Sequence, residues 1–123
     1  MHYKSLKFWQ KTIDLTAEIY RLTKFLPKDE LYGLTNQLRR AAVSIPSNIA
    51  EGNARGSTKE YLRFLAIARG SIAEVETQLL ICVRLEYLAQ ENIQTALSLL
   101  NEIERMLNST ISTLRDKVSV IGE

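Results

Sequence analysis

Apolar residues recur at helical spacing in four stretches of the chain, and no stretch alternates apolar and polar residues as a strand does. The spacing predicts helices over about residues 5–25, 30–51, 58–85 and 91–117. The connections are short, which favours successive helices that run in opposite directions. The pattern therefore predicts an all-α protein, an antiparallel up-down-up-down four-helix bundle that fills residues 1–123 as one domain.

The first predicted helix carries two apolar stripes. One stripe, with steps of three, four and seven residues, consists of Leu6, Trp9, Ile13 and Tyr20. The other consists of Leu15, Ile19, Leu22 and Leu26. Two stripes bury more surface than one neighbouring helix covers, so we expect a further contact such as another subunit. Pro27 ends this helix, and Asp29 is placed to cap the next one.

The second predicted helix contains a proline. Its core stripe is Leu31, Leu34, Leu38, Ala42, Ile45 and Ile49. Pro46 lacks an N–H group and leaves the carbonyl of Ala42 without its helical partner, which predicts a kink near Pro46. The hydroxyl of Ser44 is a candidate to compensate in part. We expect Gly52, Asn53 and Gly56 to break the chain after this helix.

The last two predicted helices each have one clear apolar face. Ser57 and Glu60 form a capping-box pattern that opens the third helix. Its core face is Tyr61, Leu65, Ala68, Ile72, Val75, Leu79 and Cys82. The core face of the fourth helix is Ala96, Leu100, Ile103, Leu107, Ile111 and Leu114.

Composition and inventory exclude several classes of protein. Hydrophobic residues make up 46% of the chain, yet no apolar run has the roughly 20 residues that cross a bilayer, and no secretory signal is visible. We therefore expect a cytoplasmic protein that does not bind a membrane. Cys82 is the one cysteine and reads as a buried small hydrophobe, and the one histidine, His2, is close to the terminus.

The same inventory predicts neither an enzyme nor a cofactor or metal site. A ferritin-like di-iron site needs two Glu-x-x-His pairs, and a phosphate loop needs a Gly-rich motif, and the chain has neither. Four glutamates lie at spacings that bring carboxylates together: Glu74, Glu76, Glu102 and Glu104. Solvated faces or ion pairs explain them better than a metal does.

Positive charge is concentrated in the middle of the chain. Residues 31–70 hold six Lys and Arg against two acidic residues, whereas residues 71–123 hold four against eight. This asymmetry predicts a basic and an acidic face, or else charge pairing between helices. The candidate nucleic-acid-binding residues are Arg39, Arg55, Lys59 and Arg63.

Three of these residues surround the turn between the second and third helices. Arg55 precedes a helix N-terminus, where free N–H groups favour an anion such as a phosphate. No aromatic residues interleave with the arginines, so contact with the nucleic-acid backbone is expected rather than base recognition. The alternative for each residue is an ordinary solvated turn.

A polar stripe on the second helix is a second feature. It steps by three and four residues through Gln37, Arg40, Ser44, Asn48 and Glu51. Pairing of the second helix with the third brings Arg40 within reach of Glu74, so we interpret Arg40, Ser44, Asn48, Glu51 and Glu74 as a structural polar network that sets helix register. The functional alternative is that the stripe lines a pore or a partner groove.

Three segments carry a family resemblance: Phe8-Trp-Gln-Lys11, Tyr32 through Ala-Val-Ser-Ile-Pro-Ser-Asn-Ile-Ala-Glu-Gly52, and Phe64-Leu-Ala-Ile-Ala-Arg-Gly-Ser-Ile-Ala-Glu74. The chain resembles the bacterial four-helix bundle family named for reading frames within intervening sequences of 23S ribosomal RNA genes. It is also similar to the accessory variability determinant of diversity-generating retroelements. The family pattern usually has Gly where this chain has Glu86, so the turn before the fourth helix departs from it.

The resemblance implies a ring-like homopentamer with a central channel. It also implies partners, because retroelement relatives bind a reverse transcriptase and nucleic acid through a basic surface. It offers no catalytic residue to carry over. Our leading hypothesis is a non-enzymatic oligomeric adaptor that binds RNA, DNA or a nucleoprotein by charge, and the alternative is a scaffold for protein–protein interaction alone.

Overall fold

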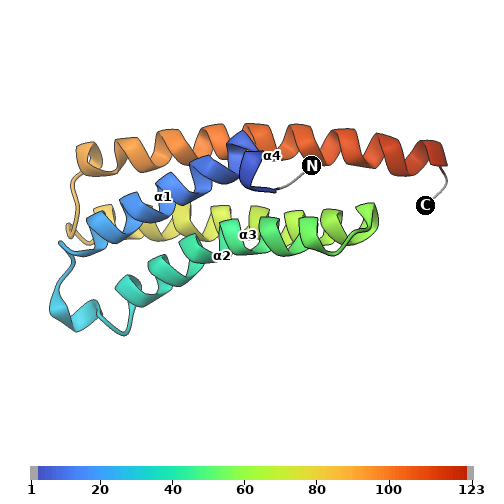
Figure 1. The fold of residues 1–123 in the computed structure, drawn as a ribbon. Helices are drawn as coiled ribbons and strands as arrows, with labels where there is room; N and C mark the ends of the chain where they lie inside the picture. Colours follow the sequence, from blue (N-terminus) through green and yellow to red (C-terminus); the bar gives the residue numbers. More distant parts are fainter. Residues whose placement is uncertain (1–2, 122–123) are drawn as a thin grey trace.

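The computed structural model describes residues 3–121 of the chain. Four α-helices and no strand occur in this range (Figure 1). The helices are α1 (Lys7–Thr23), α2 (Leu34–Ala54), α3 (Thr58–Arg84) and α4 (Gln94–Ile121). Short 3₁₀ segments precede or connect them: η1 (Tyr3–Ser5), η2 (Lys28–Glu30) and η3 (Gln90–Ile93). The predicted all-α class is confirmed.

The four helices enclose a common core. Helix α1 packs against α2 and α4, and α3 packs against the same two helices. The apolar faces of α3 and α4 are buried as predicted, except that Tyr61 and Leu114 are only partly covered. The predicted core stripe Leu15, Ile19, Leu22 and Leu26 is buried, and Leu26 lies just beyond the end of α1. The prediction for Leu31 is wrong, because it lies before α2 begins and is half exposed.

The longest lateral contact is between α2 and α3, which lie side by side in Figure 1. Hydrogen bonds join Gln37 to Gln78 near the start of α2, and Ser44 to Ser71 further along it. Position numbers therefore rise along α2 as they fall along α3. The polar stripe of α2 consequently faces polar residues of α3.

Helix α2 begins and ends later than the predicted range of 30–51. It runs through Gly52 and Asn53 to Ala54, so the expectation that these residues break the chain is wrong. Gly52 is buried within the helix, where it faces α3. The turn is made by Gly56, whose φ of 82° lies in the left-handed region that glycine adopts without strain.

Helix α1 supplies partners near Pro46. The helix α2 is continuous through Pro46, and the kink there stays a prediction. The carbonyl of Ala42, which has no N–H partner at Pro46, lies 3.3 Å from the hydroxyl of Thr16. The Trp9 indole N–H donates to the Pro46 carbonyl at 3.1 Å. The Thr16 hydroxyl also lies 2.8 Å from the Thr12 carbonyl, so its one proton serves two acceptors. The group placed to compensate Ala42 is thus on α1 and is not Ser44, which bonds elsewhere.

The turn after α3 places Glu86 in the left-handed region, with φ of 64°. The Glu86 N–H donates to the Val83 carbonyl at 3.0 Å, and the Tyr87 N–H donates to the Cys82 carbonyl at 2.9 Å. These two bonds form a Schellman motif, whose left-handed position is usually glycine. A glycine at this position would adopt the same conformation without strain.

Tyr87 then connects this turn to the start of α2. Its hydroxyl donates to Oε2 of Glu30 at 2.9 Å. The other carboxylate oxygen of Glu30 accepts the Leu34 N–H at 3.1 Å and so caps α2. The Glu30 carboxylate therefore holds the connection between α1 and α2 to the connection between α3 and α4.

Candidate nucleic-acid interface

Arg55, Lys59 and Arg63 lie around the turn that joins α2 to α3, and we refer to these three residues as the turn cluster. Arg55 extends from the end of α2, whereas Lys59 and Arg63 lie one helical turn apart on α3. The left-handed Gly56 makes the reversal between the two helices. Three of the four predicted basic residues are thus brought to one end of the molecule.

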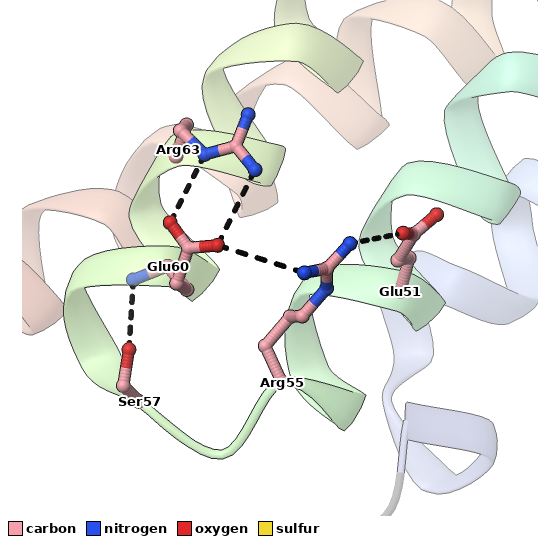
Figure 2. Close-up of polar contacts among 5 residues, drawn as sticks. All are labelled: Glu51, Arg55, Ser57, Glu60 and Arg63. Atoms are coloured by element: carbon pink, nitrogen blue, oxygen red, sulfur yellow. Dashed lines mark hydrogen bonds and ion pairs between the residues drawn. The ribbon is translucent and has the colours of Figure 1, made fainter.

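Two carboxylates accompany the turn cluster (Figure 2). Nη2 of Arg55 donates to Oε2 of Glu51 at 2.6 Å. Nε and Nη2 of Arg63 lie 3.0 and 3.3 Å from the two oxygens of Glu60, which is a bidentate arrangement. Glu60 also lies 3.9 Å from Nη1 of Arg55. One carboxylate therefore touches both arginines.

The N-terminus of α3 explains the position of Glu60. The Glu60 N–H donates to Oγ of Ser57 at 3.1 Å, which is one half of the predicted capping box. The other half would need the Glu60 side chain to reach back to the backbone, but that side chain turns to the arginines instead. The hydrogen bond from Arg63 lowers the pKa of Glu60, with smaller contributions from the charges of Arg63 and Arg55.

Phe64 supports the two arginines and was not predicted as part of the cluster. The guanidinium carbon of Arg63 lies 4.4 Å from the centroid of the Phe64 ring, and that of Arg55 lies 5.0 Å from it. Contacts of this kind hold a cation over an aromatic face. Phe64 is 6% exposed, so its ring is covered and offers no stacking surface to a base. Its contact with Arg55 crosses between helices, and no spacing within the sequence signals it.

Lys59 is the member of the turn cluster that no carboxylate neutralises. Its side chain is exposed, and none of the ion pairs among residues 3–121 includes it. The cluster therefore has three cations against the carboxylates of Glu51 and Glu60. Its local excess of positive charge is smaller than the sequence indicates.

Arg39 does not join the turn cluster. It lies 16 positions before Arg55 on α2, which is about 24 Å along the helix axis. Its Nε donates to the hydroxyl of Thr23 at 2.8 Å, and its guanidinium carbon lies 4.7 Å from the centroid of the Tyr20 ring. Arg39 thus connects α2 to the end of α1, and the four predicted basic residues do not form one patch.

The predicted polar network is brought together only in part. Oγ of Ser44 and Oγ of Ser71 are 2.9 Å apart, and the Asn48 amide donates to Ser44 Oγ at 2.9 Å and to the Ser44 carbonyl at 2.7 Å. Glu51 pairs with Arg55, away from this group. Ser44, Asn48 and Ser71 are therefore the connected members.

Arg40 and Glu74 share a groove without forming an ion pair in the described part of the chain. The groove has a volume of about 470 Å³ and lies between α2 and α3. Its lining is Asn36, Gln37, Arg40, Ala41, Ser44, Ser71, Glu74 and Gln78. The expected Arg40–Glu74 contact is absent, and both side chains are exposed.

The first apolar stripe of α1 faces outward at two positions. Ile13 is 43% exposed and Tyr20 is 40% exposed, whereas the second stripe fills the core. A groove of about 450 Å³ between α1 and α2 is mainly apolar. Its lining is Trp9, Ile13, Thr16, Ala17, Val43, Pro46 and Ser47. The first stripe therefore contributes Trp9 and Ile13 to an apolar groove on the surface.

The described residues offer few groups for other chemistry. Residues 3–121 contain no cluster of three or more His, Cys, Asp or Glu side chains placed to hold a metal ion. Cys82 is fully buried, and burial together with the charge of Glu30 raises the pKa of its thiol to about 11. In the same range, none of the helices combines the length and apolar character needed to span a bilayer.

Comparison with known proteins connects this fold to a family. The chain is similar to a protein of unknown function from the S23 ribosomal protein family of Bacteroides thetaiotaomicron. The two are 28% identical with a TM-score of 0.78, and the match covers 85% of this chain and 97% of that chain. No curated protein matches the chain. The family described as 23S rRNA-intervening sequence protein matches residues 4–109, and the chain belongs to this family.

Proposed function

We propose that the protein is a non-enzymatic oligomeric adaptor that binds the phosphate backbone of nucleic acid through the turn cluster. The observation that supports this proposal most directly is the grouping of Arg55, Lys59 and Arg63 at one end of α2 and α3. The nucleic acid is either free or part of a nucleoprotein such as a reverse transcriptase complex. The family description, which refers to 23S rRNA, makes RNA the first ligand to test.

The chemistry of the turn cluster favours contact with phosphates over reading of bases. Arginine guanidinium groups bind phosphate oxygens through paired N–H donors. The aromatic ring next to the turn cluster belongs to Phe64 and is buried beneath the guanidiniums. Binding should therefore tolerate changes of sequence and weaken steeply with salt, because counterions are released when cations contact phosphates.

Oligomerisation is the second part of the proposal. We infer that the four helices form an antiparallel up-down-up-down bundle, and that the apolar groove around Ile13 and Val43 is covered by another subunit. A homopentamer, as the family resemblance implies, presents five turn clusters to one ligand. Several weak sites on one assembly bind a long polyanion more tightly than one site does. Light scattering that gives a stable monomer of 14.0 kDa would contradict this part.

The backbone-binding proposal is tested with fluorescent 20-nucleotide RNA and DNA across a salt series. The triple variant Arg55→Glu, Lys59→Glu, Arg63→Glu should lose most of the affinity. The matched control is Arg105→Glu, Arg115→Glu, Lys117→Glu, which makes the same charge change at exposed positions of α4. Binding that is absent, insensitive to salt, or equally reduced in both variants argues against the turn cluster.

A protein scaffold is the second candidate function. It is favoured by the pairing of Arg55 with Glu51 and of Arg63 with Glu60, which leaves less charge for nucleic acid. A surface of alternating charges suits a protein partner with complementary charges. Recovery of a stoichiometric protein partner after nuclease treatment supports the scaffold, and loss of all partners with nuclease supports the adaptor.

A further inference from the structure

The position that a phosphate would take in the turn cluster is already filled by a side chain. The Glu60 carboxylate makes two contacts with Arg63, at 3.0 and 3.3 Å, and a third contact of 3.9 Å with Arg55. This fork-shaped contact is the one that guanidinium groups also make with phosphate. Glu51 holds the other side of Arg55 at 2.6 Å, as Figure 2 shows.

The cations have a support that the carboxylates lack. Both guanidiniums rest against the buried ring of Phe64, and this contact does not depend on the ion pairs. The side chains of Arg55 and Arg63 are 46% and 55% exposed, and those of Glu51 and Glu60 are 53% and 37% exposed, so exposure alone does not distinguish the two pairs. Within the described residues, the hydrogen bonds and ion pairs of the two carboxylates are all with arginines, so each carboxylate can rotate into solvent without losing another partner.

We propose that Glu51 and Glu60 act as an internal competitor that occupies Arg55 and Arg63 until a polyanion displaces it. The proposal rests on the proposed function, because it concerns the same surface. It adds a regulatory contact: the free protein shields its own arginines, and only a ligand with several closely spaced phosphates displaces both carboxylates. A nucleic-acid backbone has this spacing, whereas an isolated anion replaces one carboxylate at most.

The magnitudes allow such a displacement. Exposed ion pairs between residues three or four apart on a helix are weak, so breaking both pairs lowers the affinity for RNA by roughly threefold to fivefold. Both arginines contact phosphates in the complex whether or not the carboxylates are present, so the slope of log affinity against log salt, which reports the phosphates contacted, stays nearly the same. Removal of both carboxylates should therefore raise the affinity roughly threefold to fivefold and leave the slope nearly unchanged.

The test compares two double variants of the full chain in their binding to a fluorescent 20-nucleotide RNA. Glu51→Gln with Glu60→Gln removes the competitor and retains good helix formers. Glu76→Gln with Glu104→Gln makes the same change of net charge on exposed residues without ion pairs in the described range. Glu76 lies 16 positions beyond Glu60 on α3, about 24 Å along the helix.

We expect tighter binding, with a nearly unchanged salt slope, for the first variant alone. Equal changes in both variants would mean that net charge alone matters, and no change would mean that the carboxylates do not compete; either result overturns the inference. Suppose that wild type binds RNA, that the triple variant Arg55→Glu, Lys59→Glu, Arg63→Glu does not, and that Glu51→Gln with Glu60→Gln leaves the affinity unchanged. The inference then fails and the proposed function stands. If neither wild type nor any variant binds RNA, the inference and the proposed function both fail.

A second readout follows the arginine itself. The Nε–H resonance of Arg63 reports the carboxylate directly, because Nε donates to Glu60. Addition of RNA should move this resonance to the position that it takes in the RNA complex of the Glu60→Gln variant. RNA binding that leaves the Arg63 Nε–H resonance unmoved would overturn the inference, even if the variant Glu51→Gln with Glu60→Gln binds RNA more tightly than wild type.

Discussion

Gly52 of α2 and Phe64 of α3 approach so closely that a Cβ on Gly52 would lie 2.6 Å from the Cβ of Phe64. The same Cβ would lie 3.1 Å from Cδ1 of Tyr61. Glycine is therefore required here for close helix contact. Because Phe64 also supports Arg55 and Arg63, this contact fixes the position of the turn cluster relative to the core.

Gly52→Ala should lower the free energy of unfolding by about 0–2 kcal/mol, because overpacking costs about 1–3 kcal/mol and helix propensity returns about 1 kcal/mol. Gly70→Ala is the matched control, since a Cβ on this exposed residue of α3 meets no atom within 4 Å. It should gain about 0.5–1 kcal/mol. Urea unfolding measures both variants, and a stabilised Gly52→Ala would contradict the close contact.

Helical spacing predicts the core because it reports which positions share a face. Ile72, Val75 and Leu79 are buried as their spacing indicates. Spacing does not report which neighbour lies opposite a given face. Tyr20 thus belongs to an apolar stripe in sequence, yet it lies exposed on α1 under the guanidinium of Arg39.

The candidate site was predictable as a group of charges but not as a set of pairs. The basic residues around Gly56 follow from the position of the turn. The partner of Glu60 does not, because the sequence equally permits a backbone cap and an ion pair with Arg63, and the side-chain conformation decides between them. The Thr16–Ala42 contact was missed for a related reason: Thr16 lies on another helix from Pro46, whose ring creates the need for it.

Thr16→Val should destabilise the protein by about 1–2 kcal/mol, since it removes the hydroxyl that lies 3.3 Å from the buried carbonyl of Ala42. Pro46→Ala restores a backbone N–H that donates to this carbonyl. In the Pro46→Ala background, Thr16→Val should therefore cost less than about 0.5 kcal/mol. A double-mutant cycle from urea unfolding measures the coupling, and additive effects would show that the Thr16 hydroxyl does not serve Ala42.

Glu86→Gly should stabilise the protein by about 0.5–1 kcal/mol. A left-handed conformation costs a residue with a Cβ about 1–2 kcal/mol, part of which is offset by the greater unfolded-chain entropy of glycine. Glu86→Ala removes the same charge and keeps the Cβ, so it should bring no gain. Thermal unfolding of the three proteins separates the backbone effect from the charge effect. A gain of equal size in both variants would assign it to charge.

Tyr87→Phe should change how stability depends on alkaline pH. The hydrogen bond to Glu30, with desolvation and nearby negative charge, raises the pKa of Tyr87 above its ordinary value of 10.0. A raised pKa in the folded state means that this contribution to stability is complete below about pH 10 and is lost as pH rises through the folded pKa.

Urea unfolding from pH 7 to 11.5 should give a constant stability difference between wild type and Tyr87→Phe up to about pH 10, and a shrinking difference above it. Cys82, whose raised pKa causes a loss in an overlapping range, is present in both proteins, and its charge is also one of the groups that raise the pKa of Tyr87. A difference that stays constant to pH 11.5 would show that the Tyr87–Glu30 contact does not perturb the phenol.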